Sequence, residues 1–200
     1  MKYYGRQRPI LTISYFSSMK KKAFAQIAFE FLSIVFAVLL ALGLNTFKQS
    51  LDLQNEAALL KNKIILECKH NQLELDTVIN LNSDFKKYLD SLNQLDEVVE
   101  DFNISIASEL LTKSAWNFTQ ASKSFSHLDE DFLNDAATVY EMQEYYMLIS
   151  NQMFQNFGQM ILSDPEVEQS ISISDYYLSN LNATASSLKN AYTQFLTKYE

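Results

Sequence analysis

The sequence predicts an all-α protein in which one transmembrane helix near the start continues into a bundle of about four long helical segments. Glycine occurs three times and proline twice among 200 residues, too rarely for the many turns of a strand-rich fold. Residues 23–47 are apolar almost throughout. Further along, apolar residues recur every three or four positions, which is the spacing of an amphipathic helix. Segments with one apolar face each are expected to pack against one another as a bundle.

The apolar stretch 23–47 is long enough to cross a membrane, because a spanning helix needs about 20 apolar residues at ~1.5 Å each. The helix is predicted to begin near Lys20, at the three lysines that precede the stretch. A cleaved signal peptide is the alternative, with residues 41–43 as a passable cleavage site. The apolar core of a signal is about 7–15 residues long, so the sequence favours an uncleaved anchor.

Charge divides the chain into three parts. Residues 1–22 contain six basic residues and no acid, whereas the whole chain carries a net charge of −8. Short basic flanks stay in the cytoplasm. This predicts a basic cytoplasmic arm (1–22), a transmembrane helix (23–47) and an acidic helical-bundle domain (48–200) outside the cytoplasm. Such a domain lacks the basic face that a nucleic acid requires, so the partners expected are the lipid bilayer and another protein chain.

A long helix is predicted to follow the span, because the chain has no glycine or proline between Leu44 and Gly158. Residues 80–84 are the expected kink or break, since Asn, Ser and Asp favour helix caps. The predicted core-facing positions of this helix are Leu53, Ala57, Leu60, Ile64, Cys68, Asn71, Leu75, Val78, Asn82, Phe85, Leu89 and Leu92.

A second helix is predicted after a turn at residues 100–103, with Asn103 or Ser105 as its N-cap. Its expected inner face comprises Ile104, Ala107, Leu111, Ala115 and Phe118. A polar connection at 122–127 follows.

Asp129 is predicted to begin a third helix. Residues 163–165 end it, because Pro165 disfavours helical conformation in the residue before it. A last helix is predicted from about Ser174, with apolar residues close to the 3.5-residue period of a coiled coil. The predicted inner face of the third helix is Phe132, Ala136, Val139, Tyr146, Met153, Phe157 and Met160. That of the last is Tyr177, Leu181, Thr184, Leu188, Ala191, Phe195 and Tyr199.

No motif in the chain indicates catalysis. A glycine-rich phosphate loop, a G-x-S-x-G elbow and an H-E-x-x-H sequence are all absent. His70 shares a helical face with Glu67 and Glu74, an arrangement that could hold a cation but that exposed helices often show. Cys68 is the only cysteine, which excludes an intrachain disulfide and favours a small packing residue. The sequence therefore predicts no catalytic residue, no metal site and no cofactor.

Six polar and small residues of the apolar stretch gather on one face, whereas Ala25, Ala28 and Gly43 are small residues that lie on other faces. At about 100° per residue the six fall within roughly 80° of one another, with the last at the edge of that face. Small residues let helices approach closely in lipid, and polar residues bond across the contact. The predicted intramembrane contact, called the span stripe below, is Gln26, Glu30, Ser33, Ala37, Ala41 and Asn45.

Trp116 is the only tryptophan. A large aromatic side chain on an amphipathic helix favours a role as a bundle anchor. A ligand or partner pocket is the alternative.

The segment EFLSIVFAVLLALGLN, from Glu30 to Asn45, resembles the span of an uncharacterised family of small single-pass membrane proteins from Bacteroidota. That family usually has Gly at the position of Ala37, Gln at that of Gly43, and Asn-Trp in place of residues 46–47. The resemblance implies a bacterial cell-envelope location and an anchor followed by helices, and it implies no catalytic residue. The matching positions are Glu30, Ala37, Leu39, Ala41, Leu42 and Asn45, followed by Ser114, Ala115, Trp116, Leu133 and Tyr140.

The resulting hypothesis is a non-enzymatic scaffold, accessory or assembly subunit of the bacterial inner (cell) membrane. It would act through its span and bundle, as a homo-oligomer or with a membrane protein partner. A ligand-sensing extracytoplasmic bundle that signals through a membrane partner is the second hypothesis. An envelope hydrolase is the third, and it would need a site around Trp116 or His70.

Overall fold

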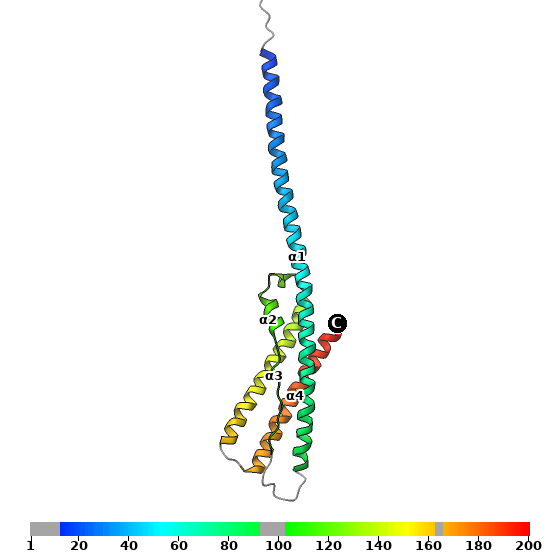
Figure 1. Cartoon of the computed structure of the whole chain (residues 1–200), viewed down its shortest axis with the longest axis vertical. Helices are drawn as coiled ribbons and strands as arrows, with labels where there is room; N and C mark the ends of the chain where they lie inside the picture. Colours follow the sequence, from blue (N-terminus) through cyan, green and yellow to red (C-terminus); the bar gives the residue numbers. More distant parts are fainter. Residues whose placement is uncertain (1–12, 93–102, 163–165) are drawn as a thin grey trace, which may run out of the picture. The chain divides into compact units, whose positions relative to one another are not determined.

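The computed structural model describes residues 13–92, 103–162 and 166–200, and these residues are almost entirely helical (Figure 1). The elements are α1 (Ile13–Leu92), α2 (Ser114–Ala121), the 3₁₀ helix η1 (Lys123–His127), α3 (Glu130–Leu162) and α4 (Val167–Tyr199). No strand occurs within the described ranges. The predicted all-α class is confirmed.

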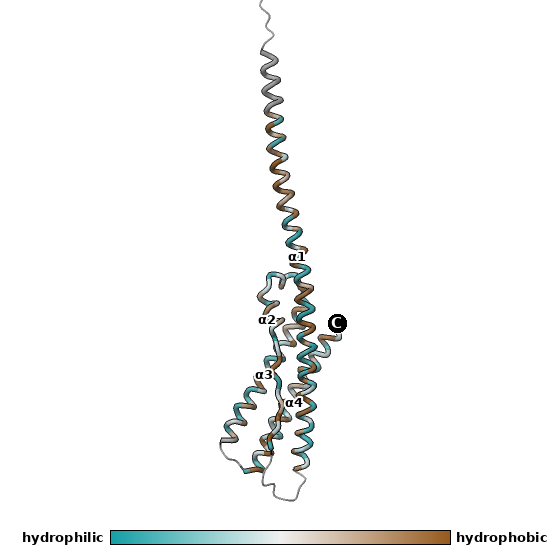
Figure 2. The backbone as a smooth tube through the Cα atoms, viewed as in Figure 1, coloured by the Kyte–Doolittle hydropathy of each residue, from teal (hydrophilic) through white to brown (hydrophobic). Residues whose placement is uncertain are grey.

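The chain divides within α1 into two compact units, Met1–Asp52 and Leu53–Glu200. In the first unit, α1 starts at Ile13, earlier than the predicted start near Lys20. Its apolar part is the dense hydrophobic band of Figure 2, and the large apolar side chains from Phe24 to Phe47 are exposed. Among the described residues, this is the one helical segment long and apolar enough to cross a membrane, by length and composition.

In the second unit, the remainder of α1 packs with α3 and α4. Contacts between α1 and α3 advance in the same direction along both helices, from Cys68–Tyr140 to Asn71–Gln143. Contacts between α1 and α4 advance in opposite directions: Lys69 meets Glu200, and Lys86 meets Asp175. The helix α3 therefore runs parallel to this part of α1, and α4 runs antiparallel to it.

The buried faces of α1 and α3 agree with the sequence analysis. Ten of the twelve predicted α1 positions are buried and the terminal two, Leu53 and Leu92, are half-buried; all seven predicted α3 positions are buried. On α4 the predicted positions alternate between buried and half-buried. Leu178, Ala185 and Tyr192 are also fully buried, and each of them is next to a predicted position. The buried face of α4 is therefore wider than the single row of residues that the sequence predicts.

The start of α3 is also as predicted. The backbone N–H of Phe132 donates to Asp129 Oδ1 at 2.9 Å, which satisfies one of the unpaired donors at a helix start. Glu130 and Asp131 occupy the first turn, where negative charge stabilises the helix dipole.

Three further predictions about helix boundaries are wrong. The break at residues 80–84 does not occur, because α1 continues to Leu92. The second predicted helix is largely absent: residues 103–113, called the strap below, have no regular secondary structure, and α2 begins only at Ser114. The last helix begins at Val167, so it includes the start predicted near Ser174. Residues 100–102 of the predicted turn at 100–103, and the predicted helix end at 163–165, lie outside the described residues.

Candidate functional site

The strap is held against α1 by two buried asparagines. Asn82 Nδ2 donates to the carbonyl oxygen of Ala107 at 3.0 Å, and its Oδ1 accepts from the backbone N–H of Ala107 at 2.8 Å. Asn71 makes the same pair with Thr112, at 2.7 and 3.0 Å. Each carboxamide thus satisfies both backbone groups of one strap residue, as a neighbouring β-strand would.

The spacing of these two contacts requires an extended strap. Asn71 and Asn82 are eleven residues apart on α1, a rise of about 16 Å. Their partners Ala107 and Thr112 are only five residues apart. Five residues reach about 17 Å when almost fully extended. A helix at the same positions would cover less than half of that distance.

Side chains of α3 and α4 complete the network around Thr112. Gln143 Nε2 donates to the Thr112 carbonyl at 3.0 Å, and the Tyr192 hydroxyl donates to Gln143 Oε1 at 2.7 Å. Asn71, Gln143 and Tyr192 are each at most 2% exposed. Buried polar groups of this kind are stabilising when every partner is present and costly when one is missing.

Two glutamates of α1 hold the chain that follows the strap. Glu67 Oε2 accepts from the backbone N–H of Ala115 at 2.9 Å and from the Ser114 hydroxyl at 3.2 Å. It therefore caps α2, whose own N-cap residue offers no side-chain bond. Glu56 accepts from the hydroxyls of Ser122 and Ser124 at 3.2 and 2.6 Å, at the start of η1.

The four clamping residues of α1 lie on one side of that helix. Residues 56, 67, 71 and 82 fall within about 80° of one another at 100° per residue. The strap, α2 and η1 therefore run back along this side of α1, each fixed by a polar side chain.

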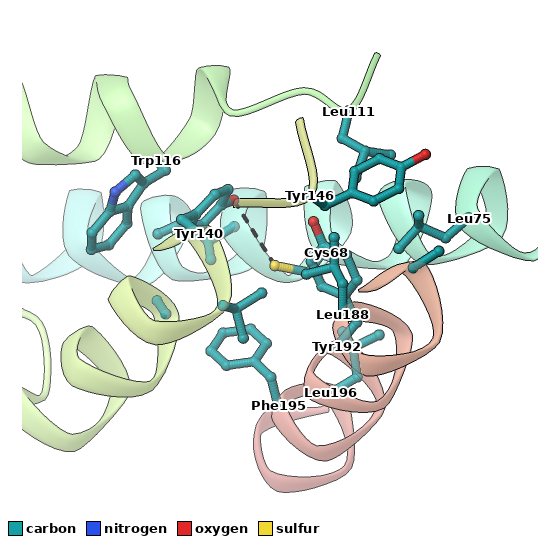
Figure 3. Packing of buried hydrophobic residues seen from close by; sticks show 14 of the residues in the cluster. Cys68, Leu75, Leu111, Trp116, Tyr140, Tyr146, Leu188, Tyr192, Phe195 and Leu196 are labelled. Atoms are coloured by element: carbon teal, nitrogen blue, oxygen red, sulfur yellow. Dashed lines mark hydrogen bonds between the residues drawn. The ribbon is translucent and has the colours of Figure 1, made fainter. Parts of the chain in front are cut away.

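The core beside α2 is aromatic, as Figure 3 shows. Trp116 is 8% exposed, and its ring stacks on Tyr140 with 5.2 Å between centroids and an interplanar angle of 11°. The Tyr140 hydroxyl donates to Glu67 Oε1 at 2.6 Å. Burial, followed by the nearby Cys68 and Glu67, raises the pKa of Tyr140 well above its ordinary value. Tyr140 is therefore a neutral donor rather than a catalytic base.

Cys68 lies in the same cluster and is fully buried. Its Sγ is 3.9 Å from the Tyr140 hydroxyl. Burial raises the pKa of the Cys68 thiol to about 12. A thiol must lose its proton to act as a nucleophile, so this side chain is a packing residue at neutral pH, and a thiol-labelling test of topology cannot use it.

We expect Cys68 to resist alkylation in the folded protein. A free cysteine has a pKa of about 8.5, so a value near 12 lowers the thiolate fraction at pH 8 by roughly a thousandfold. Iodoacetamide should therefore leave the thiol unmodified in native protein and modify it fully in denaturant, as mass spectrometry would record. Rapid modification of the native protein at pH 8 would show that the core opens around Cys68.

The three residues that share a helical face, Glu67, His70 and Glu74, do not form a cation site. His70 Nδ1 lies 3.8 Å from Glu74 Oε1, and both side chains are exposed. Glu67 instead bonds Tyr140 and the start of α2. Within the described part of the chain, no group of three His, Cys, Asp or Glu side chains is arranged to hold a metal.

The span stripe is exposed, as are the large apolar side chains on the other sides of this part of α1. All six residues from Gln26 to Asn45 are exposed. The side chain of Gln26 donates to Glu30 Oε1 at 3.4 Å, and the Ser33 hydroxyl donates to the Glu30 carbonyl oxygen at 2.8 Å. The hydrogen bonds of Gln26, Glu30 and Ser33 shown by the structure therefore stay within α1.

The sequence analysis missed the strap although the sequence contained two signals for it. Residues 103–106 alternate polar and apolar side chains, with Ile104 and Ile106 as β-branched members, which is the pattern of a strand. Asn71 and Asn82 occupy core positions of α1, and a buried carboxamide requires hydrogen-bond partners. Together these signals indicate an extended segment that offers its backbone to α1.

Comparisons with protein-family models, with curated proteins and with solved structures find no match to this chain.

Proposed function

We propose that the protein is a non-enzymatic, single-pass membrane protein that serves as a scaffold, accessory or assembly subunit. Its basic arm would lie in the cytoplasm, and its acidic helical unit would lie outside the cytoplasmic membrane of a bacterium. The basic flank and the resemblance to a family from Bacteroidota support this orientation and location. The contact would form through the span and the bundle, either between copies or with another membrane protein.

The span stripe carries this proposal. Glu30 is an exposed ionisable residue within an apolar helix, and in lipid such a residue is costly unless it finds a partner. Ala37 and Ala41 follow on the same face and are small enough for a second helix to approach. A contact through this face would shield the Glu30 carboxyl group from lipid and satisfy it.

The second unit offers an exposed leucine row in support of the same role. Leu59, Leu66 and Leu73 recur every seven residues and are 62%, 65% and 60% exposed. Residues two positions apart on a helix are separated by about 200° around its axis. Leu66 therefore lies almost opposite Ile64 and Cys68, which are buried. A heptad row of leucines is typical of a helix that packs against another helix.

Photo-crosslinking tests the span contact. With a photo-reactive residue at position 33, we expect a specific crosslinked product in membranes that falls at least fivefold in Glu30→Leu and Ala37→Leu. Ala28→Leu is the control, because Ala28 is nine residues before Ala37 and lies on the opposite face of the helix. An unchanged product in both stripe variants, or an equal loss in Ala28→Leu, would contradict the proposal.

The orientation of the chain in the membrane can be tested separately, by labelling a thiol on the exposed side of α4. Ser186 is exposed and Cys68 is buried, so Ser186→Cys creates one accessible thiol in the second unit. We expect a membrane-impermeant maleimide to label Ser186→Cys in cells whose outer membrane is permeabilised, if they have one. Labelling only after lysis of the inner membrane would show that the orientation is reversed.

Ligand sensing stays the second candidate function. One observation favours it, an open groove of about 440 Å³ between α3 and α4. A sensor would need to pass its signal to a partner in the membrane, and the span stripe could provide that contact.

A further inference from the structure

The groove between α3 and α4 is large enough for a small molecule. Its volume of about 440 Å³ falls within the roughly 300–1,000 Å³ typical of such sites. The α3 side includes Glu141, Met142 and Tyr145, and the α4 side includes Ala183. Met142 is half-buried and Ala183 is exposed, so the groove has an apolar surface that is open to a ligand.

The hydroxyl groups that line this groove act towards a ligand as acceptors. Thr138 donates to the carbonyl oxygen of Asn134, Thr184 to that of Asn180, and Ser187 to that of Ala183, each at 2.9 Å. Because each hydroxyl hydrogen is used within its own helix, only oxygen lone pairs are offered to the groove. The Tyr145 hydroxyl is the one other polar group that could donate.

The groove also carries an unpaired negative charge. Glu141 forms no ion pair or hydrogen bond with the residues that the structure describes. Tyr145 is 57% exposed, and the face of an aromatic ring attracts cations. Carboxylate, ring face and hydroxyl oxygens therefore favour the same kind of ligand group, a positive charge with hydrogen atoms to donate.

The neighbouring lysines do not neutralise this charge. The helices α3 and α4 contain two lysines, and each bonds elsewhere: Lys189 with Asp76 at 2.5 Å, and Lys198 with Asp135 at 2.7 Å. Neither lysine lines the groove. The lysines of these two helices therefore leave the exposed Glu141 carboxylate free to meet a positively charged ligand.

We propose that the α3/α4 groove binds a small organic cation, an ammonium group attached to an apolar body. The ammonium group contacts the Glu141 carboxylate and the hydroxyl oxygens, and the apolar body lies against Met142, Tyr145 and Ala183. This site is separate from the span stripe, so its failure would leave the proposed membrane contact untouched.

The test uses the full chain in phosphatidylcholine nanodiscs with ¹³C-methyl-labelled methionine. The probe is 2-phenylethylammonium, compared with 2-phenylethanol and phenylacetate, which carry the same ring on a neutral and a negative group. We expect the Met142 methyl signal, assigned with Met142→Leu, to shift saturably with the cation. We also expect the cation to bind at least tenfold more tightly than either analogue.

Matched variants separate the groove from the general acidity of the domain. Glu141→Gln should reduce the preference for the cation over the alcohol to about twofold, whereas Glu130→Gln removes the same charge elsewhere on α3 and should preserve it. Ala183→Leu and Ser187→Leu should each block binding by filling the groove, with circular dichroism confirming the fold. Equal binding of cation and alcohol, equal effects of the two glutamine variants, or unimpaired binding in both leucine variants would overturn the proposal.

Discussion

Replacing Asn71 with alanine should lower the free energy of unfolding of the second unit by about 3 kcal/mol. The substitution removes both hydrogen bonds to the backbone of Thr112 and the contacts with Gln143 and Tyr192. Leaving a buried donor or acceptor unpaired costs about 1–3 kcal/mol, and several groups lose a partner here. The measurement is urea unfolding of the full chain in nanodiscs, followed by far-UV circular dichroism.

Asn82→Ala should have the same kind of effect at the other clamp, because Asn82 bonds both backbone groups of Ala107. Asn80→Ala is the matched control, since Asn80 is exposed on the same helix two residues away and should change stability by less than about 0.5 kcal/mol. Hydrogen exchange at the Ala107 and Thr112 amides identifies the cause. Unchanged exchange in the Asn71 and Asn82 variants would show that the strap does not depend on these side chains.

The helices of the second unit could largely be predicted from the sequence because their burial follows helical periodicity. Leu60, Leu75 and Phe132 belong to rows of residues that are spaced three or four positions apart. Each of them is fully or almost fully buried. Periodicity is a property of one segment, so it needs no knowledge of the partner. The start of α3 was predictable for the same reason, since Asp129 caps its own helix.

Local preference indicates an extended segment only at residues 103–106, because the hydrogen-bond partners of the strap are distant in sequence. The sequence analysis places Asn82 on the core-facing side of the helix and also in a break at residues 80–84, because Asn, Ser and Asp favour helix caps. In the structure Asn82 is fully buried and bonds Ala107 instead, so the helix continues past it. The same contact replaces the intrahelical bonds that Ala107 would make in the predicted second helix.

The span stripe and the α3/α4 groove differ in how much the structure adds to what the sequence indicates. The span stripe residues are exposed, and their partner in the membrane would be another chain. Their spacing and chemistry are therefore what points to a contact. The α3/α4 groove is different, because it joins residues from two helices. Glu141 and Ala183 are far apart in sequence, and only their placement in one groove suggests a ligand.

Replacing Trp116 with alanine is expected to cost about 3–5 kcal/mol, the range for large aromatic side chains in a core. Trp116 is 8% exposed and stacks on Tyr140, so its removal would leave a cavity beside the Tyr140–Glu67 hydrogen bond. Phe118→Ala is the control on the same helix, because Phe118 is 57% exposed. It should cost less than about 1 kcal/mol, mostly through the contact of the Phe118 ring with Lys63.

The variants Trp116→Ala and Phe118→Ala together distinguish two roles for Trp116, an anchor of the bundle and part of a pocket for a partner. An anchor lowers the free energy of unfolding when it is removed, whereas a residue kept for a partner leaves that free energy nearly unchanged. Urea unfolding followed by circular dichroism distinguishes the two, because Trp116→Ala leaves no tryptophan for fluorescence. Equal, small costs for both variants would mean that α2 adds little to the core and that Trp116 serves contact with another molecule. A large cost for Trp116→Ala alone would assign α2, and the Glu67 cap that positions it, to the stability of the bundle.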